Sequence, residues 1–374
     1  MLDFNKILKK SGLMILVVAV LIAAIGIISI YSSTYQKEGK LWQDIYKRQI
    51  LWLILGVALF IFISKLRYRT LWDGAYILYG IIIVLLFFVF LLGVTRLGAQ
   101  RWLRIGGFNF QPSEFAKIAI ILFLARYFSN KSIGDLYQPA IRFRLFRGFI
   151  LPLMLVGVSV GLIIEQPDLG SALMVLFVFL GIVYISGVRL VYLVSFLSVG
   201  ILSMPVLWHF LRDYQKERLM VFLNPNIDPL GAGYTIIQSK IAIGSGGLFG
   251  KGWLLGTQSQ LRFLPESHTD FIFATFAEEW GFLGATVLLA LYFVIIRYGF
   301  GVASRTSDSF GRILALGITF LLSIQIFINI SMTLGLAPVV GIPLPFMSYG
   351  GSSMFINFIA LGILVSIDNT RSAF

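Results

Sequence analysis

The sequence contains no cysteine and only two histidines, His209 and His268. The absence of cysteine excludes disulfide bonds, thiolate metal sites and a cysteine nucleophile. Zinc sites take most of their ligands from cysteine and histidine, so two histidines argue strongly against a zinc protein. No metal ligands are therefore predicted.

Charged residues are also scarce. They make up 13% of the chain, whereas 58% is hydrophobic and the mean hydropathy is +0.90. Apolar runs of about 18 residues or more recur along the whole length, which is typical of an all-α polytopic membrane protein. The first run, 13–31, is long enough to span a membrane and no small-residue cleavage site follows it, so we expect an anchor. We expect one membrane domain over residues 1–374.

The apolar pattern predicts about ten transmembrane helices and one long extracytoplasmic loop, residues 209–270. The predicted spans are 12–31, 49–64, 72–94, 114–128, 148–165, 170–187, 190–208, 271–296, 312–333 and 351–367.

Acidic residues are fewer than basic ones, and the net charge is +13. No basic run or platform of alternating basic and aromatic residues is present, so we expect no nucleic-acid partner; basic loops facing anionic membrane lipid account for the charge. In the short loops, Lys and Arg fall mainly on the side that carries both termini. The positive-inside rule then places both termini in the cytoplasm and the 209–270 loop outside.

The stretch Leu264-Pro-Glu-Ser-His-Thr-Asp270 closes the long loop and delivers a carboxylate to the mouth of the eighth span. We interpret Asp270 as the chemical centre. The alternative is that Asp270 is merely a favourable acid in the first helical turn, with Thr269 as the N-cap.

Glu278 follows eight residues later, about 12 Å deeper if the helix begins at Asp270. Paired carboxylates of glycoside hydrolases lie about 5 to 10 Å apart, so this pair suits hydrolysis poorly. Glycosyl transfer from a diphosphate needs only one base, because the leaving group departs without protonation, together with positive charge to stabilise it. The external cations available are Arg101, Arg104, Lys117 and Lys240.

The polar stretch 96–117 predicts a helix start at Pro112-Ser113, with Ser113 as the cap. Glu114 and Lys117 are then three residues apart on one face of the fourth span. An ionisable pair at a membrane helix is a functional hypothesis by default. The alternative is a purely structural ion pair.

Two glycine-containing stretches could bind anions. Three prolines between Gly335 and Ser353 break the helix at membrane depth, and Ser348, Gly350 and Gly351 then begin the tenth span with free N–H groups. The alternative is an ordinary proline-rich re-entrant linker. Six glycines in 244–256 indicate either a phosphate cradle or a string of turns.

For two further polar segments we predict a structure rather than a catalytic role. Residues 233–244, which include Lys240, predict a short amphipathic helix near the membrane interface. The acidic corner formed by Glu165 and Asp168 is interpreted as turn chemistry.

Four motifs in this order resemble the shape, elongation, division and sporulation family over essentially the whole chain. They are Gly98-Ala-Gln-Arg-Trp-Leu103, Gln111-Pro-Ser-Glu-Phe-Ala-Lys117, Leu264-Pro-Glu-Ser-His-Thr-Asp-Phe-Ile-Phe273 and Gly341-Ile-Pro-Leu-Pro-Phe-Met-Ser-Tyr-Gly-Gly-Ser-Ser353. Gln100 and the sequence of residues 340–345 are more similar to the elongation members of this family than to its division members.

The resemblance implies a peptidoglycan glycosyltransferase that polymerises lipid II on the outer face of the bacterial cytoplasmic membrane. It also implies a class B penicillin-binding protein as the crosslinking partner. Family knowledge places the essential aspartate at Asp270 and marks Arg101, Glu114 and Lys117 as sensitive positions. A divalent cation, Mg or Mn, is commonly associated with activity in the family, but no ligands are assigned here.

The resulting hypothesis has Asp270 acting as general base in an inverting transfer. Arg101 and Lys117 would neutralise the pyrophosphate, with Glu114 holding Lys117 in place. A lipid-precursor flippase or transporter is the main rival, because broken helices and buried acids also describe carriers, although no internal repeat is evident. The sequence is also compatible with a division-type polymerase of the same family, or with a scaffold that docks the penicillin-binding protein.

Overall fold

The computed structural model describes residues 10–36, 44–96, 99–105, 108–130 and 145–370. Helices dominate it, and each predicted span is covered by a helix. The helices that cover the predicted spans are α2 (Lys10–Thr34), α4 (Ile45–Lys65), α5 (Tyr68–Leu92), α6 (Pro112–Ser129), α9 (Leu151–Glu165, preceded by a π-helical turn over Phe146–Ile150), α10 (Leu169–Ile185), α11 (Leu190–Leu202) continued by α12 (Met204–Phe210), α16 (Ile272–Arg305), α17 (Ser309–Thr333) and α18 (Gly351–Thr370).

The prediction of a polytopic helical membrane protein is confirmed. The predicted count of ten spans is not confirmed. Among the described residues, seven helical segments are long and apolar enough to cross a membrane alone, or up to eight if the bent pair α11–α12 is one span. The other two predicted spans fall short for visible reasons: α6 carries Glu114, Lys117 and Arg126, and α10 has only 17 residues.

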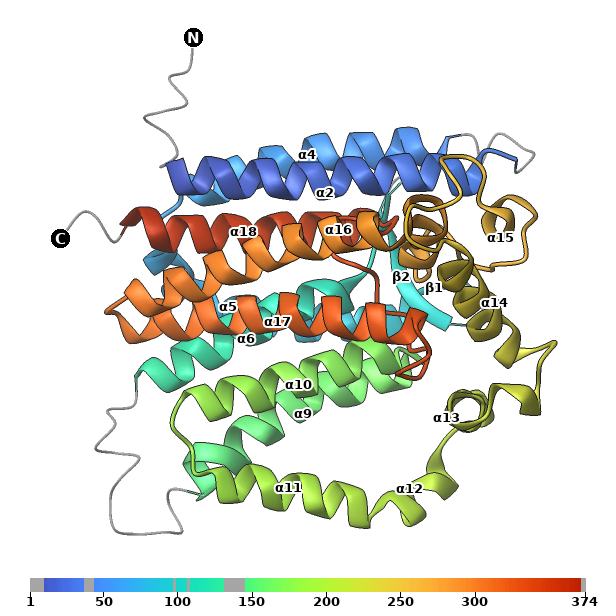
Figure 1. The fold of residues 1–374 in the computed structure, drawn as a ribbon. Coiled ribbons are helices and arrows are strands. Elements are labelled where there is room, and N and C mark those ends of the chain that lie inside the picture. Colours follow the sequence, from blue (N-terminus) through green and yellow to red (C-terminus); the bar gives the residue numbers. More distant parts are fainter. Residues whose placement is uncertain (1–9, 37–43, 97–98, 106–107, 131–144, 371–374) are drawn as a thin grey trace.

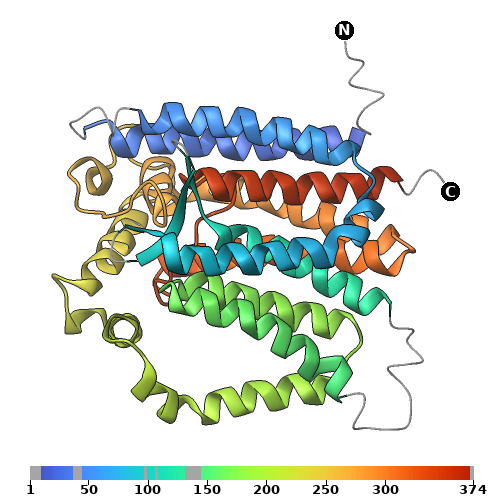
Figure 2. The same ribbon diagram turned by 180° about the vertical axis from the view of Figure 1, so that it is seen from behind.

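Figures 1 and 2 show the helices stacked in layers, with α2 and α4 on one side of the bundle and α11 on the other. The start of α2 and the end of α18 lie at one end of the bundle. The opposite end carries the extramembrane helices of the long loop, which are α13 (Asp213–Leu223), a 3-10 turn (Pro225–Ile227), α14 (Ala232–Ser245) and α15 (Thr257–Gln260). The predicted helix over 233–244 is therefore present as α14.

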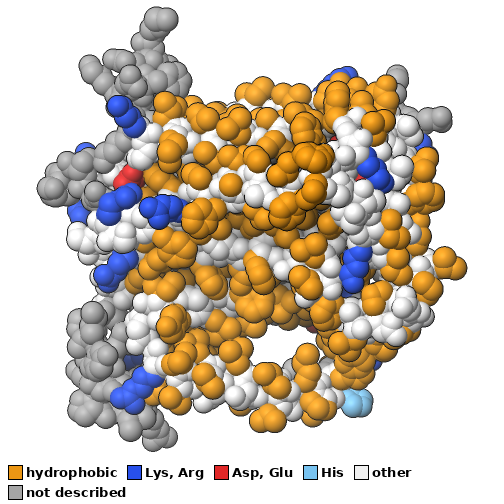
Figure 3. Space-filling model, viewed as in Figure 1, with side chains coloured by type: hydrophobic (Ala, Val, Ile, Leu, Met, Phe, Trp, Pro, Cys, Tyr) orange, Lys and Arg blue, Asp and Glu red, His pale blue; other side chains and the backbone are white. Residues whose placement is uncertain are grey.

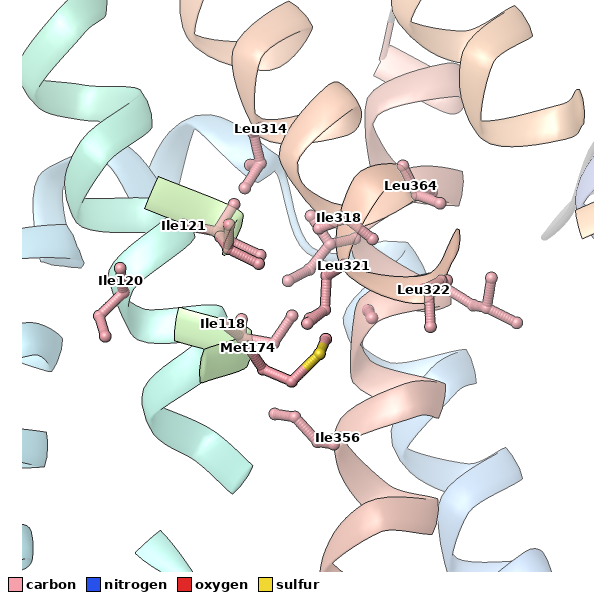
Figure 4. Packing of buried hydrophobic residues seen from close by; sticks show 14 of the residues in the cluster. Ile118, Ile120, Ile121, Met174, Leu314, Ile318, Leu321, Leu322, Ile356 and Leu364 are labelled. Carbon is pink, nitrogen blue, oxygen red and sulfur yellow. The ribbon is translucent and has the colours of Figure 1, made fainter. Parts of the chain in front are cut away.

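The core lies where α6, α10, α17 and α18 meet. One side chain from each helix, all 4% exposed or less, illustrates the packing in Figure 4: Ile121, Met174, Ile318 and Ile356. Helices in a bilayer associate through close packing rather than hydrophobic transfer, so small residues at contacts matter. At Gly317, a Cβ atom would lie 2.8 Å from the Ile121 side chain.

One element was not predicted. The loop between α5 and α6 forms a three-stranded antiparallel sheet of β1 (Val94–Arg96), β2 (Ala99–Ile105) and β3 (Phe108–Phe110), in the order β1-β2-β3. Leu103 pairs with Phe110, and a bulge interrupts the β1–β2 register after Val94. The sheet fixes the position of Arg101 on its central strand.

The eighth predicted span is broken rather than continuous. Gly281 has φ 64° and ψ −164°, which divides α16 into two helices. The glycine-rich segment covers this break: Lys251 and Gly252 donate backbone N–H groups to the carbonyls of Glu278 and Glu279, each at 3.0 Å.

On the other side of the break, Phe282 and Leu283 donate their N–H groups to the carbonyls of Gly247 and Leu248 at 2.9 and 3.1 Å. Irregular backbone at membrane depth requires such internal partners. Of the two interpretations of this glycine run, the structure therefore shows turns, which serve to cap a broken helix.

Replacing Gly250 by Ala is expected to destabilise the protein by about 2 kcal/mol or more, because Gly250 has φ 82° and a Cβ would lie 2.1 Å from the Glu279 carbonyl. Gly244→Ala is the matched control, since no atom lies within 4 Å of a Cβ there. Thermal unfolding in detergent measures both. Equal melting temperatures for the two variants would contradict the capping role.

Candidate active site

Asp270 lies on a strained loop before α16 rather than within its first turn. The helix begins at Ile272 with Phe271 at the N-cap position, and no side chain caps it. The Thr269 hydroxyl instead donates to the Glu266 carboxylate at 2.9 Å. The alternative of a first-turn acid capped by Thr269 is therefore wrong. Glu266 has φ 49°, a left-handed conformation that costs energy for a non-glycine residue and is often found at functional sites.

Two hydrogen bonds attach this loop to the proline-rich segment before α18. The Ser348 hydroxyl donates to the Thr269 carbonyl at 2.7 Å. The Tyr349 N–H donates to the His268 carbonyl at 3.0 Å. Both contacts fall within two residues of Asp270, so they fix the path of its backbone.

A third attachment comes from Asn329 on α17. Its side-chain amide donates to the Asp270 carbonyl at 3.0 Å and to the Ile342 carbonyl at 2.8 Å. The carboxylate of Asp270 lies beside Gly341, where a Cβ would be 3.6 Å from its Oδ2 atom. The loop and the proline-rich segment thus form one unit around Asp270.

The surroundings of the Asp270 carboxyl group raise its pKa from 3.8 to about 6. Burial is the main cause, and the negative charge of Glu266 is the next. The positive charges of Arg218 and Arg101 oppose the rise, and Asp168 adds slightly to it. Within the described part of the chain no hydrogen bond or ion pair occupies this carboxyl group, so its oxygens can accept a proton.

Arg101 reaches from β2 to the corner between α9 and α10. Its guanidinium donates to the carbonyls of Gln166, at 3.4 Å, and Pro167, and its Nη1 atom lies 3.7 Å from Asp168 Oδ1. The positive charge of Arg101 acts on the Asp270 carboxyl group, and the role of Arg101 in binding substrate stays a prediction. Much of the hydrogen-bonding capacity of Arg101 is nevertheless used by the protein.

Asp168 is the N-cap of α10, accepting the Ser171 N–H at 3.2 Å, which agrees with its interpretation as turn chemistry. It also accepts hydrogen bonds from Ser113, at 2.9 Å, and Gln111, at 3.2 Å. The prediction that Ser113 caps α6 is wrong, because Gln111 holds the N-cap position and the Ser113 hydroxyl is used by Asp168.

Glu114 and Lys117 form the predicted ion pair at 2.6 Å, with side chains 4% and 2% exposed. Among the described residues, the Oε2 atom of Glu114 has no hydrogen-bond partner. The pair lies inside the bundle, so Lys117 does not present its ammonium group to the surface.

The predicted anion site at the start of α18 has most of its groups engaged. The Ser348 hydroxyl accepts the Leu344 N–H at 2.8 Å in addition to its bond to Thr269. The Gly350 N–H donates to the Gln49 side chain at 3.3 Å, and Gly351 is buried. These residues stabilise the segment beside Asp270, and their role as substrate ligands stays a prediction.

Two other sequence candidates lie apart from Asp270. Lys240 is exposed on α14, with its side chain against Gly335, and it is not among the charges that act on Asp270. The Glu278 carboxylate accepts hydrogen bonds from Lys251 at 2.7 Å and Thr257 at 3.0 Å. Asp270 therefore has no paired carboxylate in Glu278.

Sequence reasoning missed Arg218 on α13, whose charge acts on Asp270. The 209–270 segment contains six basic residues, and nothing in the sequence singled this one out.

Among the described residues, no group of three or more His, Cys, Asp or Glu side chains could hold a metal ion. No ligands for Mg or Mn are assigned, and the mechanism proposed below contains no metal-dependent step.

Fold and site together define a polytopic membrane protein in which the charges of Arg101 and Arg218 act on the half-buried Asp270 carboxyl group. The FtsW/RodA/SpoVE family of cell cycle proteins matches residues 12–373. The chain therefore belongs to this family, the shape, elongation, division and sporulation family that the four motifs resemble.

Its relatives are similar over nearly their full length. The chain is 43% identical over 345 residues to the peptidoglycan glycosyltransferase MrdB of Escherichia coli K12, covering 91% of this chain and 89% of MrdB. It is 36% identical over 367 residues to the probable peptidoglycan glycosyltransferase FtsW of Trichlorobacter lovleyi, covering 96% and 93%.

Two solved structures share the fold. The rod shape determining protein RodA of Thermus thermophilus matches with a TM-score of 0.69 and 29% identity, covering 96% of each chain. A chain from a structure of a peptidoglycan synthase complex that coordinates polymerization and crosslinking matches with a TM-score of 0.79 and 30% identity, covering 96% of this chain and 97% of that one.

Replacing Asp270 by Asn is expected to stabilise the protein at neutral pH. A carboxyl group whose pKa is higher in the folded state than the ordinary 3.8 binds its proton more tightly when folded. Ionisation therefore costs stability as pH rises from about 4 to about 6, and the full cost is present above pH 6. Asn avoids this cost.

Thermal unfolding in detergent from pH 4 to 7.5 measures the effect. The gain in melting temperature for Asp270→Asn should be largest at pH 7.5 and shrink toward pH 4. Glu217→Gln, at an exposed acid on α13, should leave the melting temperature unchanged at pH 7.5. A lower melting temperature for Asp270→Asn at pH 7.5 would contradict the burial of this carboxyl group.

Proposed function

We propose that this chain, a peptidoglycan glycosyltransferase, polymerises lipid II with Asp270 as the general base. The observation that carries this assignment is the half-buried Asp270 carboxyl group, which has free oxygens and lies within the electrostatic reach of Arg101 and Arg218. A pKa of about 6 keeps most of this base ionised at neutral pH while leaving it a stronger base than an exposed aspartate.

In the proposed step, the 4-hydroxyl of the acceptor sugar attacks the anomeric carbon of the lipid-linked donor. The new bond joins that oxygen to the anomeric carbon, and the bond from this carbon to the diphosphate oxygen breaks. The diphosphate leaves with the electron pair, and the hydroxyl proton passes to Asp270. Attack opposite the leaving group inverts the anomeric configuration.

Positive charge must stabilise the departing diphosphate. Arg101 supplies part of it at the α9–α10 corner, where its side chain is 23% exposed. Lys117 is buried against Glu114, so in this proposal the pair supports the site from within α6 rather than contacting the diphosphate.

The membrane arrangement follows from the two ends of the bundle. The start of α2 and the end of α18 lie opposite α13, α14 and α15 (Figure 1). With the positive-inside pattern of the short loops, this supports both termini in the cytoplasm and Asp270 at the outer face of the bacterial inner membrane.

In this proposal the prenyl chain enters between the main body of the bundle and the α11–α13 segment. Figure 3 shows an opening there with hydrophobic side chains around it. On α11 only Leu193 is buried and Phe196 packs against Phe149, whereas apolar side chains such as Val194 and Leu197 are exposed. Such an opening would let a lipid-linked sugar reach the site sideways from the bilayer.

The cellular role and partner are inferred from the relatives. Identity is higher to MrdB, at 43%, than to FtsW, at 36%, which supports cell elongation over division. The similar chain from the peptidoglycan synthase complex supports a class B penicillin-binding protein as the crosslinking partner.

A transporter is the second candidate, favoured by the break in α16 at Gly281. Purified protein in detergent with lipid II separates the two, because detergent has no compartments between which a carrier could move lipid. Glycan polymer under these conditions identifies an enzyme, and its absence in the wild type refutes the proposed function.

Asp270→Asn should lower the polymerisation rate by about 10² to 10⁴-fold, because the amide cannot accept the proton. The wild-type rate should also fall as pH drops through about 6, where the base becomes protonated. Gel analysis of glycan strands made from lipid II between pH 5 and 8 measures both. Full activity of Asp270→Asn, or a rate unchanged down to pH 5, contradicts the assignment.

A further inference from the structure

The two arginines whose charges act on Asp270 differ in the hydrogen bonds and ion pairs that their guanidinium groups already form with the protein. Arg101 donates to two carbonyls and faces Asp168. Arg218 forms no hydrogen bond or ion pair with any described part of the chain; it contacts the Tyr214 ring, whose centroid lies 5.8 Å from the Arg218 Cζ atom. A guanidinium group has five N–H donors in a planar fork that matches phosphate oxygens.

The position of Arg218 is defined by its helix. Tyr214 lies one turn earlier on α13, so its ring holds the Arg218 side chain on the same face. The helix packs against α14, which in turn packs against α16 and α17. This chain of contacts places α13 at the same end of the bundle as the start of α16, which follows Asp270 (Figure 1).

We propose that Arg218 is the residue that binds the diphosphate of the lipid-linked donor and stabilises it as it leaves. This inference rests on the proposed function. Arg101 then serves chiefly to hold the α9–α10 corner, with Asp168, beside the reacting sugar. Arg218 makes bidentate contact with the phosphate oxygens that enter past α13.

Asp270 and Arg218 have opposite charges and therefore different roles in the transfer step. Asp270 takes up the proton of the acceptor, and Arg218 faces the negative charge that develops on the other side of the anomeric carbon. A cation with no protein anion to release binds the diphosphate without first breaking an ion pair. Arg218 is therefore better placed for this role than Lys117, whose ammonium group is bound to Glu114.

The test compares Arg218→Ala and Arg218→Lys with Lys216→Ala. Lys216 is on the same helix, and two residues correspond to about 200°, so it faces away from Arg218 while its loss changes the net charge equally. Binding of farnesyl diphosphate and farnesyl monophosphate to purified full-length protein is measured first, and polymerisation of lipid II second.

Arg218→Ala should weaken farnesyl diphosphate binding by about tenfold or more and remove the preference for diphosphate over monophosphate. Arg218→Lys should fall between Arg218→Ala and the wild type, because a lysine keeps the charge but not the fork. Lys216→Ala should match the wild type. The polymerisation rate should follow the same order.

Wild-type affinity of Arg218→Ala for farnesyl diphosphate, with an active wild-type polymerase, would overturn the role of Arg218 alone. An inactive wild type would instead overturn the proposed function. If Arg218→Ala does not fold, the comparison of Arg218→Lys with Lys216→Ala decides, and equal diphosphate affinity in those two variants would refute the inference.

Discussion

The structure depends on hydrogen bonds that tie two irregular segments together at one end of a helical bundle. Backbone groups outside helices must find partners inside a membrane protein, because lipid offers none. Asn329 and Ser348 supply these partners, and both bond to carbonyls at or next to Asp270. The groups that satisfy the backbone are thus the ones that position the carboxylate.

The break in α16 follows the same constraint. Gly281 frees carbonyl and N–H groups on each side, and the backbone of the glycine-rich segment pairs with both sets. Gly250 permits the glycine-rich segment to lie close to the backbone of α16, because a Cβ atom at this position would clash with the Glu279 carbonyl oxygen. The half-helix that follows Asp270 is therefore held at both of its ends.

The sequence could predict the helical segments, because each span is a long apolar run, and it could predict the importance of Asp270, which ends the one long polar loop. The Glu114–Lys117 contact was also predictable from helical spacing. The break at Gly281 and the hydrogen bond from the Ser348 hydroxyl to Thr269 could not be predicted, because each depends on residues far away in the chain. The sheet around Arg101 was also missed, although its strands are neighbours in the sequence. Arg218 is one of six basic residues in the 209–270 segment, and the sequence alone does not show that its charge acts on Asp270.

The most direct test of this account is the turnover number of Asn329→Ala relative to Gln325→Leu in lipid II polymerisation. Gln325 lies one turn earlier on α17 and is equally buried, and its amide nitrogen finds no hydrogen-bond partner in the part of the chain that the structure describes. The account predicts that Asn329→Ala lowers turnover by about tenfold or more with little change in KM, because the Asp270 backbone loses an attachment, while Gln325→Leu stays near the wild-type rate. Wild-type turnover in Asn329→Ala would contradict it.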